Sequence, residues 1–105
     1  MTLAVCSRQY VATSPEGKQV NGQVEVLIPA EKGRFQWECE VRLGPIETSP
    51  FLVMGVDSWQ AIQQAMHMTY VQIDHRERTG WKFLWLEDEA FGSRMLLPAR
   101  GQERA

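Results

Sequence analysis

Apolar and polar residues alternate most strictly over residues 35–43. The apolar positions are Phe35, Trp37, Cys39, Val41 and Leu43. Polar residues fill the positions between them, including Glu38 and Glu40. A period of two is typical of a β-strand with one face on a core and the other in water. The pattern therefore predicts an antiparallel strand whose outward face carries Glu38 and Glu40.

Two further strands are predicted before this one. Residues 3–13 are rich in small and β-favouring residues and end at the turn signal Ser14-Pro15-Glu16-Gly17. Residues 20–28 place valines on one face, after an Asn21-Gly22 pair that we interpret as a bulge or irregular strand entry rather than a hairpin. Residues 31–34 (EKGR) predict a second turn.

The segment from Gly44 to Gly55 divides into two parts. Pro45 and Pro50 make its first half a loop or an edge strand, because proline cannot donate to a β-ladder. Residues 51–54 are apolar on both faces. A short segment of this kind is typical of a central or helix-covered strand.

The stretch GVDSWQAIQQAM, residues 55–66, predicts the start of a helix. Asp57 or Ser58 suits the N-cap, and Asp57 has capping-box spacing to Gln60. We expect the helix to run over about residues 57–78 and to stop before Gly80. A stripe at three- and four-residue steps predicts its buried face. That stripe consists of Trp59, Ile62, Met66, Thr69 and Ile73.

A last strand is predicted at about residues 81–87, with Trp81, Phe83 and Trp85 on one face. Two interpretations stay open for this aromatic face. It packs against the helix as core, or it forms an exposed patch that binds a partner. The fold class is α+β: a mostly antiparallel sheet of about five strands with one long helix on one face. We expect a single domain over residues 1–98 and a flexible tail over 99–105.

Composition narrows the function classes. The 105 residues are 44% hydrophobic and carry a net charge of −2, so a folded domain is expected. No basic face is apparent, which argues against nucleic acid or a membrane surface as partner. The N-terminus lacks a signal-peptide pattern, and the expected location is cytoplasmic.

Residues with catalytic potential do not form a recognised motif. Cys6 and Cys39 are expected to be reduced, structural thiols. His67 and His75 are eight positions apart, which is too far to chelate one ion from a single helix. No nucleophile elbow or glycine-rich phosphate loop occurs. We therefore expect no enzymatic activity, no cofactor and no metal.

The preferred function is protein interaction, with another protein or with a second copy as partner. The candidate partner-binding residues are Glu38, Glu40, Trp81 and Trp85. The alternative is a small-molecule-binding or enzymatic domain with a pocket between helix and sheet. A deep polar pocket containing His67, His75, Cys6 or Cys39 would favour that alternative, and a flat aromatic or acidic patch would favour binding.

The helix start also carries a resemblance. Gly55, Asp57, Gln60 and Ala61, followed by the aromatic strand at 81–85, resemble an uncharacterised family of small bacterial domains. The resemblance spans roughly residues 3–86 and implies a fold without an established activity. Similar small domains occur among immunity-type proteins that neutralise toxins by binding them. By association, the resemblance suggests an immunity-like or accessory binding protein.

Overall fold

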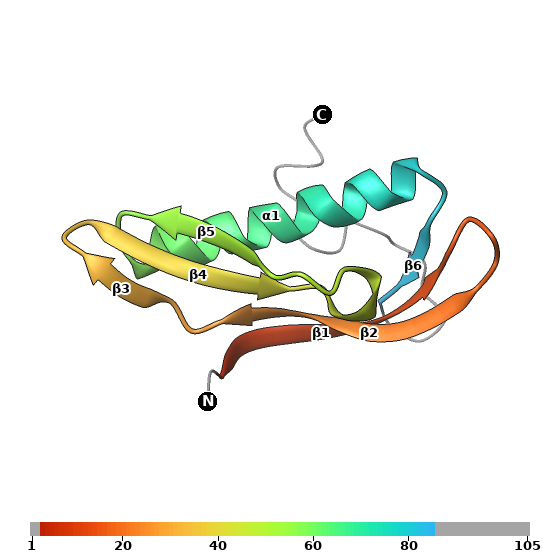
Figure 1. The fold of residues 1–105 in the computed structure, drawn as a ribbon, viewed down its shortest axis with the longest axis horizontal. Coiled ribbons are helices and arrows are strands. Elements are labelled where there is room, and N and C mark those ends of the chain that lie inside the picture. The colour runs from red at the N-terminus through yellow and green to blue at the C-terminus, as the bar shows by residue number, and fades with distance from the viewer. Residues whose placement is uncertain (1–2, 86–105) are drawn as a thin grey trace.

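A computed structural model describes residues 3–85 and shows one sheet with one long helix (Figure 1). Every strand pairing in it is antiparallel, which confirms the α+β prediction. In chain order, the elements are β1 (Ala4–Thr13), β2 (Gln19–Leu27), β3 (Ala30–Gly33), β4 (Gln36–Arg42), a 3-10 turn η1 (Gly44–Ile46), β5 (Phe51–Gly55), α1 (Ser58–Arg78) and β6 (Lys82–Leu84).

The six strands occupy five positions across the sheet, because β2 and β3 pair with the same side of β4. The order is β3-β4-β2-β1-β6, with β5 on the other side of β4. Val26 lies opposite Val41 and Ala30 opposite Glu38, so residues 27–29 face only residues 39–40. This extra residue is a bulge that bends the chain between β2 and β3, at Pro29, which has no N–H for the ladder. β2 and β3 are therefore two halves of one bent strand.

Three local expectations were wrong. Residues 30–33 form β3 rather than a turn, and the turn falls at Arg34 and Phe35 instead. Phe35 adopts φ 57° and is exposed, so it does not belong to the buried face of β4. The pairing of Gly22 with Tyr10 is regular, and the bulge of this pair of strands lies near Val5.

The helix covers one face of the sheet and runs in roughly the direction of the strands (Figure 1). Asp57 is the N-cap: its Oδ1 accepts from the Gln60 N–H at 2.8 Å. The Gln60 side chain accepts in turn from the Val56 N–H at 2.8 Å. The Asp57 bond confirms the predicted N-cap, while the Gln60 side chain bonds the residue before the N-cap, and α1 ends at Arg78, as expected.

The buried stripe of α1 is rotated from the predicted one. Its buried residues are Ala61, Ala65, Thr69 and Ile73. Trp59 is 74% exposed and Met66 is exposed as well, so this part of the prediction was wrong. The helix starts in close contact with the end of β5, since a Cβ on Gly55 would lie 2.4 Å from the Ala61 nitrogen. Small side chains fit this contact and a tryptophan does not.

β6 and the residue that follows it, Trp85, contribute large aromatic side chains to the core. Phe83 and Trp85 are buried, and their rings stack with centroids 5.7 Å apart. Tyr10 from β1 meets both rings edge-on. The predicted strand end at residues 86–87, the domain end at 98 and the tail at 99–105 lie outside the described residues. Within residues 3–85, no helix combines the length and hydropathy that a membrane span requires.

Candidate functional site

The four predicted binding residues do not form one surface. Glu38 and Glu40 lie on the outer face of β4, away from the helix, and both are half-buried. Trp85 is 5% exposed, and Trp81 packs against the core in partly buried form. Of the two interpretations of the aromatic face, the structure therefore supports core packing in the described residues. An accessible aromatic patch would need these rings to leave the core.

Glu38 and Glu40 each face a cation. Lys32 Nζ lies 3.9 Å from a Glu38 carboxylate oxygen, and Arg42 Nε donates to Glu40. Exposed ion pairs contribute little to stability. Each carboxylate is matched by a neighbouring cation. Glu38 and Glu40 therefore do not form an acidic patch.

Apolar side chains border these carboxylates on the next strand. Met54 lies directly opposite Glu38, and Leu52 opposite Glu40, in the β4–β5 pairing. Leu52 is 59% exposed and Met54 51% exposed. We call Leu52, Met54 and the outward edge of β5 the β5 margin. Two large apolar side chains on one exposed strand face are a feature of partner-binding surfaces.

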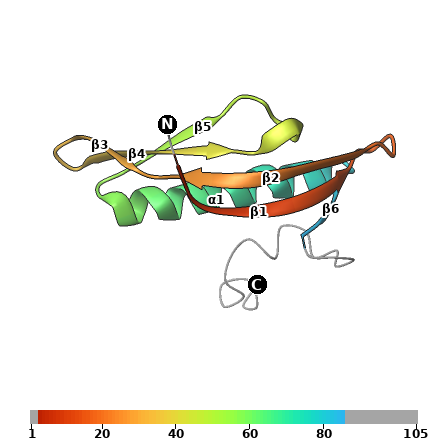
Figure 2. The ribbon, with the colours of Figure 1, turned by 90° about the horizontal axis from the view of Figure 1, so that it is seen from below.

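The outward edge of β5 has no strand beside it in the described part of the chain. β5 pairs with β4 only, and Figure 2 shows it at the border of the sheet. A strand in this position presents unpaired N–H and C=O groups that serve as a template for another strand. The β5 margin therefore combines main-chain hydrogen-bonding capacity with exposed apolar side chains.

The inner side of β5 is held firmly. Val53 is buried beneath α1, and Gly55 allows the helix to approach at Ala61. The loop before β5 is tied to the end of α1, since Arg76 lies 3.4 Å from a Glu47 carboxylate oxygen. The edge is thus presented on a strand whose other side is fixed by the core, which lowers the ordering cost of binding.

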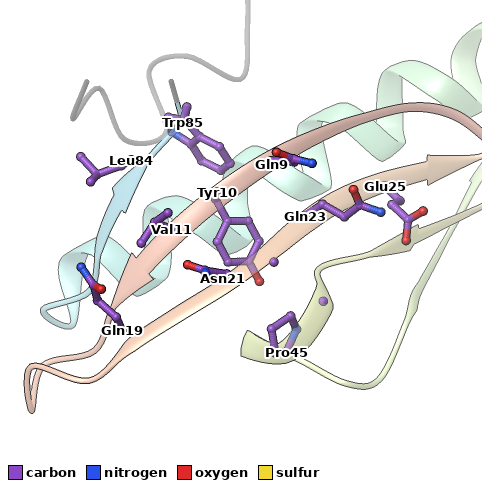
Figure 3. Close-up of a pocket in the computed structure, with 12 residues that line it drawn as sticks. Gln9, Tyr10, Val11, Gln19, Asn21, Gln23, Glu25, Pro45, Leu84 and Trp85 are labelled. Carbon is purple, nitrogen blue, oxygen red and sulfur yellow. The ribbon is translucent and has the colours of Figure 1, made fainter. Parts of the chain in front are cut away.

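A second candidate is an open depression of about 980 Å³ that involves β1, β2 and η1 (Figure 3). Side-chain amides line much of it, from Gln9, Gln19, Asn21 and Gln23. Among the described residues that line it, only Tyr10 and Glu25 are ionisable. Neutral amides can hydrogen-bond a polar surface, but they supply neither a general base nor a nucleophile.

Tyr10 has a structural role in this depression. Its hydroxyl donates to the Leu43 carbonyl at 2.6 Å, and burial raises the pKa of the phenol. The ring passes Gly22, where a Cβ would lie 2.6 Å from the Tyr10 hydroxyl and 2.6 Å from Pro45. The missing side chain of Gly22 therefore leaves the space in which Tyr10 crosses β2. Figure 3 shows the Tyr10 ring in this position, with Pro45 nearby.

A third candidate is a cleft of about 220 Å³ between α1 and the sheet. It contains Cys6, one of the four residues predicted for such a pocket. Val24, Val26 and Met66 give it an apolar lining, with Arg8 beside them. Cys39 lies in the core and donates to the Leu27 carbonyl at 3.2 Å. Burial first, and the Cys6 thiol second, raise the pKa of Cys39.

The histidines lie apart from this cleft. His67 and His75 are exposed on α1, and His67 stacks on Tyr70 with centroids 6.4 Å apart. Within residues 3–85, no group of three histidine, cysteine or acidic side chains is placed to hold a metal ion. The structure therefore does not bring the candidate catalytic side chains together.

Sequence reasoning missed Leu52 and Met54, although it identified the two glutamates beside them. Residues 51–54 are apolar on both faces, which suggested a buried strand. The available signal was the pair of prolines, Pro45 and Pro50, since proline is common at sheet edges. That signal was applied to the preceding loop and not to the strand that follows it.

Comparisons with known proteins agree with the expectation of an uncharacterised domain family. No curated protein and no solved structure matches this chain. A family model described as a domain of unknown function, DUF6968, matches residues 6–95, which include every helix and strand from β2 to β6 and most of β1. The chain therefore belongs to the DUF6968 family.

Proposed function

We propose that this protein is a polypeptide-binding domain that adds an extended segment of its partner to the edge of β5, which has no neighbouring strand within residues 3–85. The observation that carries the proposal is the β5 margin: an edge strand whose outward face exposes Leu52 and Met54. Strand addition uses main-chain hydrogen bonds for affinity and alternate side chains for selectivity. The outward edge of β5 supplies the main-chain groups, and Leu52 and Met54 supply the side chains.

The chemistry of the margin favours a neutral, apolar segment. Leu52 and Met54 would each gain a cross-strand neighbour, a contact that contributes roughly 0.2–1 kcal/mol per pair. Glu38 and Glu40 are already matched by Lys32 and Arg42, so they give a basic segment little advantage. An immunity-like or accessory role, in which the protein covers a segment of its partner, would use this same edge.

The test is a selection of peptides from a random display library on the full-length protein. We expect extended peptides with alternating apolar residues to be enriched. In the double variant Leu52→Lys/Met54→Lys, their affinity should fall by about tenfold or more, equivalent to ~1.4 kcal/mol. The charges leave the fold intact because both side chains are exposed.

The matched control is Leu3→Lys, because Leu3 is 57% exposed and lies immediately before β1. This variant should bind the selected peptides like the unmodified protein. Equal binding by all three proteins would contradict the proposal, as would a selection on the monomeric protein that enriches no peptide. Circular dichroism spectra of each variant establish that the sheet and helix are retained.

A further inference from the structure

We infer that the segment that pairs with β5 is β5 of a second copy, so that two sheets join edge to edge about a two-fold axis. This inference rests on the proposed function, because it names the occupant of the same edge. A two-fold dimer uses the same patch on both subunits, so the patch must be complementary to itself. The sequence of β5 meets this condition.

The register follows from the pleat of the sheet. Residues directly opposite each other in an antiparallel pair lie on the same face, so Leu52 must face an outward residue of the second copy. An axis at Val53 places Leu52 opposite Met54 of the second copy and pairs all five residues of β5. A shift of the axis by one residue to either side leaves part of β5 unpaired.

The side chains match in this register. Leu52 and Met54 pack on each other twice across the outer face, and Val53 meets Val53 on the inner face. Phe51 lies opposite Gly55 of the second copy. An aromatic ring can cover a glycine on a neighbouring strand, a pairing that is known to stabilise sheets. Each apolar residue of one β5 thus gains a complementary neighbour from the other.

Charge also favours a second copy. β5 contains no ionisable side chain, and the carboxylates next to it are matched by cations. The neutral seam therefore carries no repulsion between two copies of a chain whose net charge is −2. Charged side chains are a common protection of sheet edges. β3 contains Glu31 and Lys32, and the three-residue β6 contains Lys82, whereas β5 lacks this protection.

The size of the contact sets its strength. Five residues give ~17 Å of strand edge. That length is short compared with a standard interface, which buries about 1,600 Å² in total. We therefore expect a dimer that dissociates on dilution, with a dissociation constant in the micromolar range.

Sedimentation velocity over a range of protein concentrations tests the inference. The unmodified chain and Leu3→Lys should shift from monomer to dimer as concentration rises. Leu52→Lys/Met54→Lys should stay monomeric over the same range, because the axis at Val53 places the introduced cations opposite one another. A dimer that this double variant forms equally well would overturn the inference.

Cysteine crosslinking tests the register, in a Cys6→Ser background that removes the exposed thiol. Leu52→Cys and Met54→Cys are made as separate proteins and then oxidised with diamide. A disulfide should form efficiently in their mixture and poorly in either protein alone, because only the mixture places two thiols opposite each other. Equal crosslinking in all three samples would contradict the axis at Val53.

The outcomes separate the inference from the proposed function. A chain that is monomeric at every concentration, yet binds selected peptides through the β5 margin, overturns the dimer and leaves strand addition in place. A chain that neither dimerises nor binds peptides at this edge overturns both. A dimer that requires Leu52 and Met54 supports both.

Discussion

β5 and β6 both carry apolar side chains, and their surroundings differ. Each strand lies at one end of the sheet order, and each follows the same parity, with odd-numbered residues facing the helix side. Phe83 on β6 and Trp85 directly after it face inward and are buried in an aromatic cluster. On β5, the outward residues Leu52 and Met54 are largely exposed. Phe83 of β6 therefore serves the core, whereas Leu52 and Met54 of β5 face solvent.

This difference shows that the inward and outward faces of an apolar edge strand can have separate roles. β6 is a short edge strand with Lys82 on its outward face, a residue type that discourages pairing with other chains. β5 has no such residue, and its outward face can gain stability only by contact with something else. Substitutions on β6 should therefore change the stability of the fold, and substitutions on the outward face of β5 should change association.

The largest expected effect is on β6. Phe83→Ala should lower the free energy of unfolding by about 3–5 kcal/mol, because it removes a fully buried ring from a stacked cluster. Leu52→Ala should change it by less than about 0.5 kcal/mol. Urea denaturation followed by circular dichroism measures both. Similar losses in the two variants would remove the distinction between a structural edge and a binding edge.

A smaller effect separates the two sides of β5. Gly55→Ala should destabilise by about 1–3 kcal/mol, because its Cβ would lie 2.4 Å from the Ala61 nitrogen and 2.8 Å from the Ala61 Cα. These are backbone atoms, so the start of α1 has to move. Met54→Ala, one residue earlier, should be nearly neutral in the same urea titration, since its side chain is exposed. A neutral Gly55→Ala would show that α1 is not held closely on β5.

Features with local causes could be predicted from the sequence. The alternation of residues 36–42 and the capping pair of Asp57 and Gln60 each depend on neighbours within a few positions, and both are confirmed. The position of β5 depends instead on the sheet order, which residues 51–54 do not encode by themselves. The same applies to Gly22, whose role becomes visible only when Tyr10 is seen to cross it.

The buried stripe of α1 illustrates why large apolar residues mislead. Trp59 and Met66 have helical spacing to Thr69 and Ile73, yet the helix rests on Ala61 and Ala65. Both stripes fit the period of 3.6, and the distance between helix and sheet decides between them. At the start of the helix, Gly55 allows the close approach, and it is a residue with no hydrophobic signal of its own.

The smallest effect concerns Tyr10, which links the β6 cluster to the end of β4. Tyr10→Phe keeps the ring contacts with Phe83 and Trp85 and removes the hydrogen bond to the Leu43 carbonyl, a loss of about 1 kcal/mol at neutral pH. Urea denaturation at pH 7.5 measures this loss. An unchanged free energy of unfolding would mean that the bond from the Tyr10 hydroxyl to the Leu43 carbonyl contributes nothing to stability.

The same residue gives the pH dependence of stability. Burial raises the pKa of Tyr10 above its ordinary value of 10.0, so the unfolded chain loses the phenolic proton at lower pH than the folded chain. The stability that the buried neutral phenol contributes is therefore complete below pH 10 and declines as pH rises through the folded-state pKa.

Cys39, whose pKa is raised above 9.0, starts a similar decline one unit lower. Tyr10→Phe should unfold with a shallower loss of stability above pH 10, and Cys39→Ala with a shallower loss between pH 9 and 10. If the two variants instead follow the unmodified protein at every alkaline pH, neither group is kept neutral by the core, and the surroundings of Tyr10 and Cys39 are more accessible to water than their burial indicates.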